Sequence, residues 1–257
     1  MLKMFWGVDK HYPPYLKNHY FLVSANALWK KQKPYSSYKF IKRSYDRRFM
    51  ILDSGGYSLF SKFDKYPFTK QEYLKLINHY RPLAWIPMDY PCEPELLKRL
   101  NQTVEERIAS TLDNLIFFMT QPNSPPGLLA VIQGYTLKER LNCFDMILDT
   151  GLKTQWLAIG SLCALANLQK IHHIVNGLSD YAIKVGWEGK FHLFGLTIKY
   201  LKKYTLPNNI ISFDTSAWGY KIPYKDKKSA FANYKKSISP YVNWGYYELL
   251  NNDGLII

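Results

Sequence analysis

The sequence predicts an α/β fold, a (β/α)8 TIM-like barrel that forms a single domain. Three observations support this prediction. Eight short apolar segments recur along the 257 residues, charged stretches with helical spacing alternate with them, and six of the segments run into a polar or glycine ending. Alternating strands and helices fit a parallel barrel or a doubly wound sheet, and eight strands favour the closed barrel.

The eight apolar segments have the length and composition of buried parallel strands. In chain order they are residues 4–8, 20–25, 50–57, 85–94, 128–135, 156–163, 191–195 and 210–214. A parallel barrel holds its active site at the carboxyl ends of its strands. We therefore expect three aspartates, a glutamine and several glycines from the last six segments to converge on one pocket.

The stretches between the strands predict helices, some with clear start and stop signals. They are residues 69–80, 93–100, 103–119, 137–151 and 165–178. Thr69 and Thr103 are each followed three residues later by a glutamate, which is the capping-box pattern of a helix start. Gly151 and Gly177 are predicted to end helices, because glycine adopts the left-handed conformation that such ends need.

The composition points to one domain with a polyanionic partner. No repeat is visible, the proline-rich stretch at 121–127 is short, and the length suits one barrel, so residues 1–257 are assigned to a single domain. Thirty-four Lys and Arg against twenty Asp and Glu give a formal charge of +14. Such an excess favours nucleic acid as the partner, and the alternative is a basic surface without a specific role.

The cysteine content and the length of the apolar runs indicate the cellular compartment of the protein. Cys92, Cys143 and Cys163 are too few and too scattered for a disulfide framework or a paired zinc site. No apolar run approaches the roughly 18 residues of a membrane span, and the N-terminus lacks export features. We therefore expect reduced thiols, no metal, no cofactor, no membrane contact and a cytoplasmic location.

The C-terminal segment at 220–257 is basic and aromatic, with lysines interleaved among tyrosines and a phenylalanine. Such a segment suits a nucleic-acid surface, where lysines contact phosphates and rings stack on exposed bases. The alternative is a terminal helix whose aromatic residues pack on or near the barrel while its lysines are solvated.

Two carboxylates at strand ends indicate glycosyl-transfer chemistry. Asp53 is followed by a serine and two glycines at 54–56, so the backbone can approach a flat ligand closely. Asp214 is followed by Thr215 and Ser216, a polar surrounding suited to a nucleophilic carboxylate. In such chemistry one carboxylate attacks the anomeric carbon and the other moves protons. Each aspartate taken alone could instead cap the following helix.

Six of these segments together resemble a known enzyme family. They are LDSGGY at 52–57, Asp89, IQG at 132–134, AIGSL at 158–162, HLFG at 192–195 and FD at 213–214. In this order they match the signature segments of the tRNA-guanine transglycosylase superfamily. DYPCEP at 89–94, GSLC at 160–163, HLFG and DTSAW at 214–218 are closer to its DNA-modifying DpdA branch, which places 7-deazaguanines in phage and bacterial DNA. The resemblance extends from about residue 20 to residue 218, and it implies a bacterial, archaeal or phage-infected host cell.

The resemblance implies roles for individual residues. Asp214 matches the nucleophile that attacks the ribosyl C1′, and Asp53 matches the general acid/base for the departing and arriving bases. Asp89 and Gln133 match side chains that hydrogen-bond the guanine edge, and Gly160 matches a backbone N–H donor to the base carbonyl. Tyr57 and Phe194 stand where the family sandwiches the base; the other residues assigned to the substrate are Ser54, Gly55, Cys92, Gly134, Ser161 and Gly195.

Cys92 and His192 keep alternative interpretations. Cys92 follows Asp89 by three positions, whereas the tRNA enzymes usually have their cysteine two positions after it, so it could be simply a small buried residue. His192 could contact the ligand or be a satisfied core residue.

Departures from the tRNA enzymes favour DNA as the substrate. The cysteines and histidine of their structural zinc are absent, so we expect no zinc subdomain and no tRNA-recognition platform. Basic loops at 30–33 and 42–48 and the C-terminal lysines are candidates for holding the backbone.

The sequence thus predicts an enzyme that exchanges guanine in DNA for a 7-deazaguanine such as 7-cyano-7-deazaguanine. Its small-molecule partners are free guanine and the 7-deazaguanine, and a partner protein that opens the duplex is left open. The alternatives are the same reaction on tRNA and a non-catalytic nucleic-acid-binding barrel.

Overall fold

The computed structural model describes residues 2–8, 13–31, 38–41, 43–219 and 221–244. Within them, eight parallel strands form one sheet in the order β6-β5-β2-β1-β10-β9-β8-β7. The strands are β1 Lys3–Val8, β2 Phe21–Ser24, β5 Met50–Asp53, β6 Ala84–Trp85, β7 Ala130–Ile132, β8 Trp156–Ile159, β9 Lys190–Leu193 and β10 Ile210–Thr215. Each lies within or overlaps one of the eight predicted segments, and the predicted TIM-like α/β fold is confirmed.

The sheet closes on itself between its two outer strands. Trp85 of β6 forms a parallel bridge with Leu128, just before β7. The Trp85 N–H donates to the Gly127 carbonyl at 2.8 Å, and the Leu129 N–H donates to the Trp85 carbonyl at 2.9 Å. The eight strands of this sheet therefore lie side by side around the barrel in the order in which they occur in the sequence.

The core has two layers, because alternate strand residues point to opposite faces. The inner layer fills the barrel with large side chains such as Phe5, Ile51, Val131 and Trp156. The outer layer lies between the strands and the helices, and it includes Met4 and Trp6, the neighbours of Phe5 on β1. The barrel is thus filled by side chains, and the ligand site must lie at its mouth.

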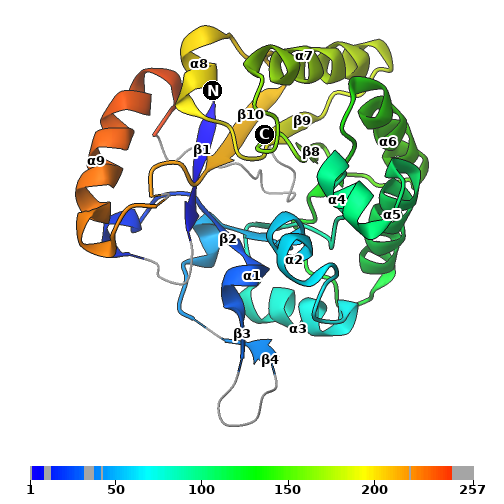
Figure 1. Cartoon of the computed structure of the whole chain (residues 1–257), viewed down its shortest axis with the longest axis horizontal. Helices are drawn as coiled ribbons and strands as arrows, with labels where there is room; N and C mark the ends of the chain where they lie inside the picture. Colours follow the sequence, from blue (N-terminus) through cyan, green and yellow to red (C-terminus); the bar gives the residue numbers. More distant parts are fainter. Residues whose placement is uncertain (1, 9–12, 32–37, 42, 220, 245–257) are drawn as a thin grey trace.

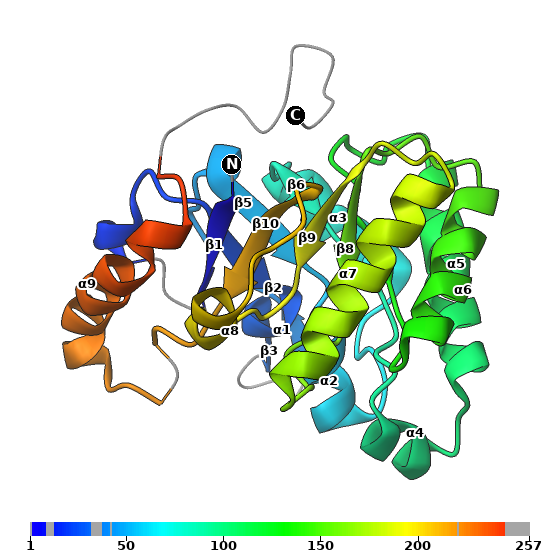
Figure 2. The ribbon, with the colours of Figure 1, turned by 90° about the horizontal axis from the view of Figure 1, so that it is seen from above.

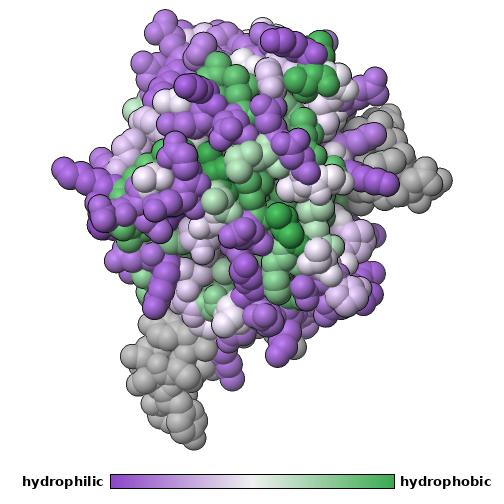
Figure 3. Space-filling model, turned by 90° about the vertical axis from the view of Figure 1, so that its right-hand side faces the viewer, coloured by the Kyte–Doolittle hydropathy of each residue, from purple (hydrophilic) through white to green (hydrophobic). Residues whose placement is uncertain are grey.

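Helices surround the barrel (Figure 1), and Figure 2 shows the strands between α9 on one side and α5, α6 and α7 on the other. They are α1 Ala25–Leu28, α2 Gly56–Phe63, α3 Lys70–Tyr80, α4 Pro94–Leu100, α5 Val104–Thr120, α6 Leu137–Asp149, α7 Leu168–Lys184, α8 Ile198–Lys203 and α9 Lys227–Ile238. The outer face in Figure 3 is mostly hydrophilic, with apolar residues between the polar ones. This distribution is ordinary for helices that bury one face.

The predicted start signals are confirmed, and one predicted stop is wrong. Thr69 and Thr103 form capping boxes, and Gly151 adopts a left-handed φ of 73° just beyond α6. Gly177, predicted to end a helix, lies inside α7. A Cβ at Gly177 would come within 2.5 Å of a Leu137 methyl group, so glycine here permits close packing of α7 against the start of α6.

Two further regions complete the described chain. A short antiparallel hairpin, β3 Trp29–Lys31 and β4 Tyr38–Phe40, projects from the barrel (Figure 1). Helix α9 packs through Phe231 on Trp6, with ring centroids 4.4 Å apart. Parts of the predicted basic loops and of the C-terminal segment lie outside the described residues. They are residues 32–33, 42, 220 and 245–257.

In the part of the chain that the structure describes, no helix combines the length and apolar character of a membrane span.

Candidate active site

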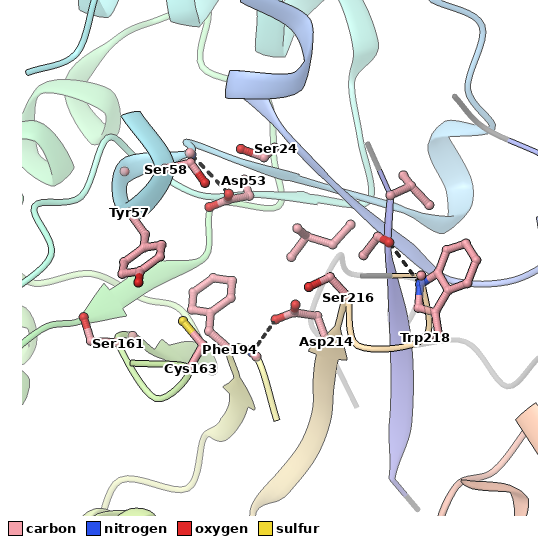
Figure 4. A pocket seen from close by; sticks show the side chains of 18 of the residues that line it. Ser24, Asp53, Tyr57, Ser58, Ser161, Cys163, Phe194, Asp214, Ser216 and Trp218 are labelled. Atoms are coloured by element: carbon pink, nitrogen blue, oxygen red, sulfur yellow. Dashed lines mark hydrogen bonds between the residues drawn. The ribbon is translucent and has the colours of Figure 1, made fainter. Parts of the chain in front are cut away.

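A cavity of about 600 Å³ opens at the carboxyl ends of the strands. The last residues of the strands and the residues just after them reach it from around the barrel, as the strand endings predicted. Of the predicted site residues, those that line it are Asp53, Gly55, Tyr57, Asp89, Gln133, Gly160, Ser161, Phe194, Gly195 and Asp214. Figure 4 shows the carboxylates of Asp53 and Asp214 on opposite walls of this cavity.

Asp89 is the centre of a buried hydrogen-bond network. The Ser54 hydroxyl donates to its Oδ1 at 2.5 Å, and the Gln133 amide donates to its Oδ2 at 2.5 Å. The Tyr66 hydroxyl donates to the Asp89 carbonyl at 2.7 Å, and the Ser161 hydroxyl donates to Gln133 Oε1 at 3.1 Å. Each carboxylate oxygen has two lone pairs, so Asp89 can still accept from a ligand while its position is fixed.

Burial raises the pKa of Asp89, and the hydrogen bonds from Ser54 and Gln133 oppose that rise. These bonds stabilise the charged form, because they are donated to the carboxylate. The network therefore holds an acceptor pair of oxygens on the cavity wall.

Asp53 has the electrostatics of a proton carrier. Burial, and then the negative charge of Asp89, raise its pKa to about 7, while a hydrogen bond from the Gly55 N–H opposes the rise. That bond joins the Gly55 nitrogen to Oδ2 of Asp53 at 3.1 Å. A more distant contribution to the rise comes from Asp214. A carboxyl group with a pKa near neutrality can both donate and accept a proton at physiological pH.

Asp214 is held at the end of β10 by groups that follow β9. The Gly195 N–H donates to its Oδ1 at 3.0 Å, and Nε2 of His192 lies 3.5 Å from the same oxygen. His192 is fully buried, and its Nδ1 lies 2.9 Å from the Ser212 hydroxyl. Its ring contacts are aromatic, and they include Phe5 with centroids 5.6 Å apart. Of the two interpretations of His192, the structure favours a buried residue that contacts the site carboxylate.

Tyr57 and Phe194 lie at one end of the cavity, together with Ser161 and Cys163 (Figure 4). Tyr57 stands in the first turn of α2, and its ring is 50% exposed. Phe194 follows β9 directly. This end of the cavity therefore offers two aromatic faces and a polar wall to a flat ligand.

The structure corrects the predicted role of the Gly160 N–H group. It donates to the Ile132 carbonyl at 3.0 Å as part of the β7–β8 pairing, so it is not a donor aimed at a base. Gly160 serves a different purpose in the cavity wall. A Cβ there would come within 2.8 Å of Gln133 Nε2, so the glycine leaves room for the amide that donates to Asp89.

Three other predicted residues do not line the cavity. Ser54 lies behind it and donates to Asp89. Cys92 is fully buried, with its thiol donating to the Tyr90 carbonyl at 3.5 Å, so it is a small core residue. Gly134 adopts a φ of 138° close to the Arg140 backbone, which only glycine tolerates readily, and it shapes the turn before α6.

Sequence reasoning missed Glu93, which also lines the cavity. It is 8% exposed, neither carboxylate oxygen has a hydrogen-bond partner among the described residues, and burial raises its pKa. The only sequence signal for Glu93 was its place in the segment DYPCEP at 89–94. Sequence reasoning also missed Arg140, whose guanidinium donates to the Gly160 carbonyl at 2.6 Å and fixes the loop after β8.

Within the described residues, no group of three or more His, Cys, Asp or Glu side chains is arranged to hold a metal ion.

A closed α/β barrel with two facing carboxylates beside an aromatic and polar cavity defines a TIM-like barrel protein with its candidate site at the carboxyl ends of the strands. Residues 43–247 match the family model DpdA, described as DeoxyPurine in DNA protein A. The match covers most of the chain, so the chain belongs to the DpdA family. It is a DNA-modifying transglycosylase of the tRNA-guanine transglycosylase superfamily. Among curated proteins, none matches this chain.

Proposed function

We propose that this enzyme exchanges guanine in DNA for a 7-deazaguanine such as 7-cyano-7-deazaguanine, through a covalent intermediate on Asp214. The observation that carries the proposal is the arrangement of Asp53 and Asp214 on opposite walls of one cavity, beside the Asp89–Gln133 pair. A base bound between the carboxylates would have a nucleophile on one side and a proton carrier on the other.

In the first half of the reaction, an Asp214 carboxylate oxygen attacks C1′ of the deoxyribose. The bond between C1′ and N9 of guanine breaks, and its electron pair leaves with the base. Asp53 in its protonated form donates a proton to the departing guanine, which leaves as the neutral base. Asp214 then carries the DNA as an ester.

In the second half, the free 7-deazaguanine enters the same cavity. Asp53, now ionised, accepts the N9 proton, and N9 attacks C1′ while the ester bond to Asp214 breaks. The two half-reactions restore both carboxyl groups to their starting states. A pKa of about 7 for Asp53 suits both directions of proton transfer.

Base selectivity follows from the Asp89–Gln133 pair. Guanine and 7-deazaguanines share the same N–H and carbonyl edge on the six-membered ring and differ in the five-membered ring. A wall that reads the shared edge accepts both bases in turn. Adenine has an acceptor at N1 where guanine has a donor, so it would leave the ligand-facing lone pairs of Asp89 unsatisfied, and an unsatisfied buried polar group costs roughly 1–3 kcal/mol.

The test is incorporation of labelled guanine and labelled 7-cyano-7-deazaguanine into single-stranded DNA, duplex DNA and tRNA. We expect label in DNA with the wild type, none with Asp214→Ala, and wild-type levels with Asp113→Asn. Asp113 is an exposed carboxylate on α5, so this variant is a matched control. Label in tRNA alone would overturn the assignment to DNA, and binding without incorporation would favour a non-catalytic barrel.

A further inference from the structure

The cavity has a second arm beyond Asp214, which base exchange alone does not require. In Figure 4, Trp218 lies on the far side of Asp214 and Ser216 from Tyr57 and Ser161. The residues of this second arm come from the segment after β10 and from the start of α9. They are Trp218, Gly219, Lys221, Ile222, Tyr224 and Lys227.

The second arm combines cationic and aromatic side chains, and the Trp218 ring among them is held in place by its contacts. Trp218 is held by its indole N–H, which donates to the Gly7 carbonyl at 3.1 Å, and by an edge contact with Trp6. Nζ of Lys227 lies 6.0 Å from the centre of the Trp218 ring. Tyr224 is 66% exposed at the rim, although most large apolar or aromatic side chains of the barrel are buried.

Two lysines contribute to the wall of the second arm. Asp226 lies in the same turn as Tyr224, but it does not line the cavity. Lys221 and Lys227 do line it, and both flank the wall that begins at Asp214. A cavity wall with two cations and an exposed ring matches the chemistry of a single nucleic-acid strand, whose phosphates are anionic and whose bases stack.

We propose that the second arm binds the sugar–phosphate backbone next to the target nucleotide, with Lys221 and Lys227 at a phosphate and Tyr224 stacked on the neighbouring base. This proposal rests on the proposed function, which sets C1′ of the target at Asp214 and its base at the Tyr57 end. The strand must then continue on the other side of Asp214. A base that stacks on Tyr224 has left its own stack, so the bound strand is unpaired at this point.

The test measures binding of an end-labelled single-stranded oligodeoxynucleotide with one guanine, by fluorescence anisotropy at several salt concentrations. Each phosphate contact on a single strand contributes about 0.7 to the slope of log K against log salt. Because the two lysines are placed at one phosphate, Lys221→Gln/Lys227→Gln is expected to reduce the slope by about 0.7, one such contribution. Lys221 adopts a left-handed φ of 57°. Glutamine, which also has a long unbranched side chain, bears this conformation at a cost similar to that of lysine, so the substitution changes mainly the charge.

Matched variants separate the contact from the overall charge. Lys75→Gln/Lys184→Gln removes the same charge from exposed positions on α3 and α7 and should leave the slope at the wild-type value. Tyr224→Ala is expected to weaken binding about ten-fold without changing the slope, and Tyr224→Phe should bind like the wild type. Thermal unfolding of each variant checks that the barrel is intact.

The second-arm proposal is overturned if Lys221→Gln/Lys227→Gln keeps the wild-type slope, or if the Lys75/Lys184 control lowers it equally. Its failure is distinguishable from failure of the proposed function. If Lys221→Gln/Lys227→Gln keeps the wild-type slope while base exchange still depends on Asp214, only the second-arm proposal is contradicted. Exchange that persists in Asp214→Ala would remove the proposed nucleophile whatever the slope.

Discussion

Nε2 of His192 and the backbone N–H of Gly195 converge on the same oxygen of Asp214, Oδ1, at 3.5 and 3.0 Å. Among the described residues, no hydrogen bond to Oδ2 is formed. The carboxylate is therefore held through one oxygen, and Oδ2 is the oxygen that the proposed attack on C1′ would use. The Ser212 hydroxyl lies 2.9 Å from Nδ1 of His192 and holds the ring from the opposite side.

His192→Phe is expected to lower the rate of base exchange about ten-fold, because the buried imidazole, whose Nε2 lies 3.5 Å from Oδ1, positions the Asp214 carboxylate. Phenylalanine keeps the aromatic packing and loses the nitrogen that faces Asp214. The kcat should fall while the KM for the free base stays close to that of the wild type. His192→Gln, which retains a donor, should recover part of the rate, and an unchanged kcat in His192→Phe would contradict this role.

Asp53 should control the pH dependence of guanine release. Its pKa of about 7 means that the protonated form needed by the leaving base is lost as the pH rises through neutrality. In a single turnover, release of labelled guanine is expected to decline above about pH 7. Asp53→Asn should release guanine slowly and without that decline. A wild-type rate that stays constant from pH 6 to about 9 would argue against Asp53 as the acid.

The same group links stability to pH. Its folded pKa of about 7 exceeds the ordinary 3.8, so its contribution to stability is fully present below pH 3.8 and is lost as the pH rises to about 7. Asp53→Asn cannot ionise and avoids this loss. Its unfolding temperature should therefore exceed that of the wild type at pH 8, with a difference that shrinks toward pH 4. A constant difference across this range would show that Asp53 ionises as easily in the folded chain as in the unfolded one.

Gly160→Ala should weaken base binding by displacing Gln133. The added Cβ would come within 2.8 Å of the amide that donates to Asp89 and within 2.9 Å of a methyl group of the buried Val131. We expect the KM for the free base to rise about ten-fold, the cost of one hydrogen bond to a charged group. Gln133→Leu should behave alike, and the double variant should add little. Independent, additive effects of the two changes would contradict this coupling.

The strands and their polar endings were predictable because a parallel barrel needs short apolar segments and places its chemistry at one end of them. Asp53, Asp89, Gln133 and Asp214 each lie in the polar ending of such a segment, and the structure brings them to one cavity. These positions depend on local pattern alone. The resemblance to the transglycosylase superfamily then assigned a role to each of these residues.

The errors concern properties that arise only from the packed barrel. The pairing of β8 with β7 engages the Gly160 N–H, and the sequence contains no information on that register. Gly177 looks like a helix stop, but it is a contact point between α6 and α7. The role of His192 becomes visible only when β9 pairs with β10 and brings it beside Ser212 and Asp214.

The covalent intermediate on Asp214 is the central claim, and intact mass measurement tests it most directly. The enzyme is incubated with a single-stranded oligodeoxynucleotide that has one guanine, without incoming base, and denatured before analysis. We predict a species whose mass is that of protein plus oligonucleotide minus guanine, linked at Asp214 and absent in Asp214→Ala. An adduct that persists in Asp214→Ala, or one that maps to another residue, would contradict the account.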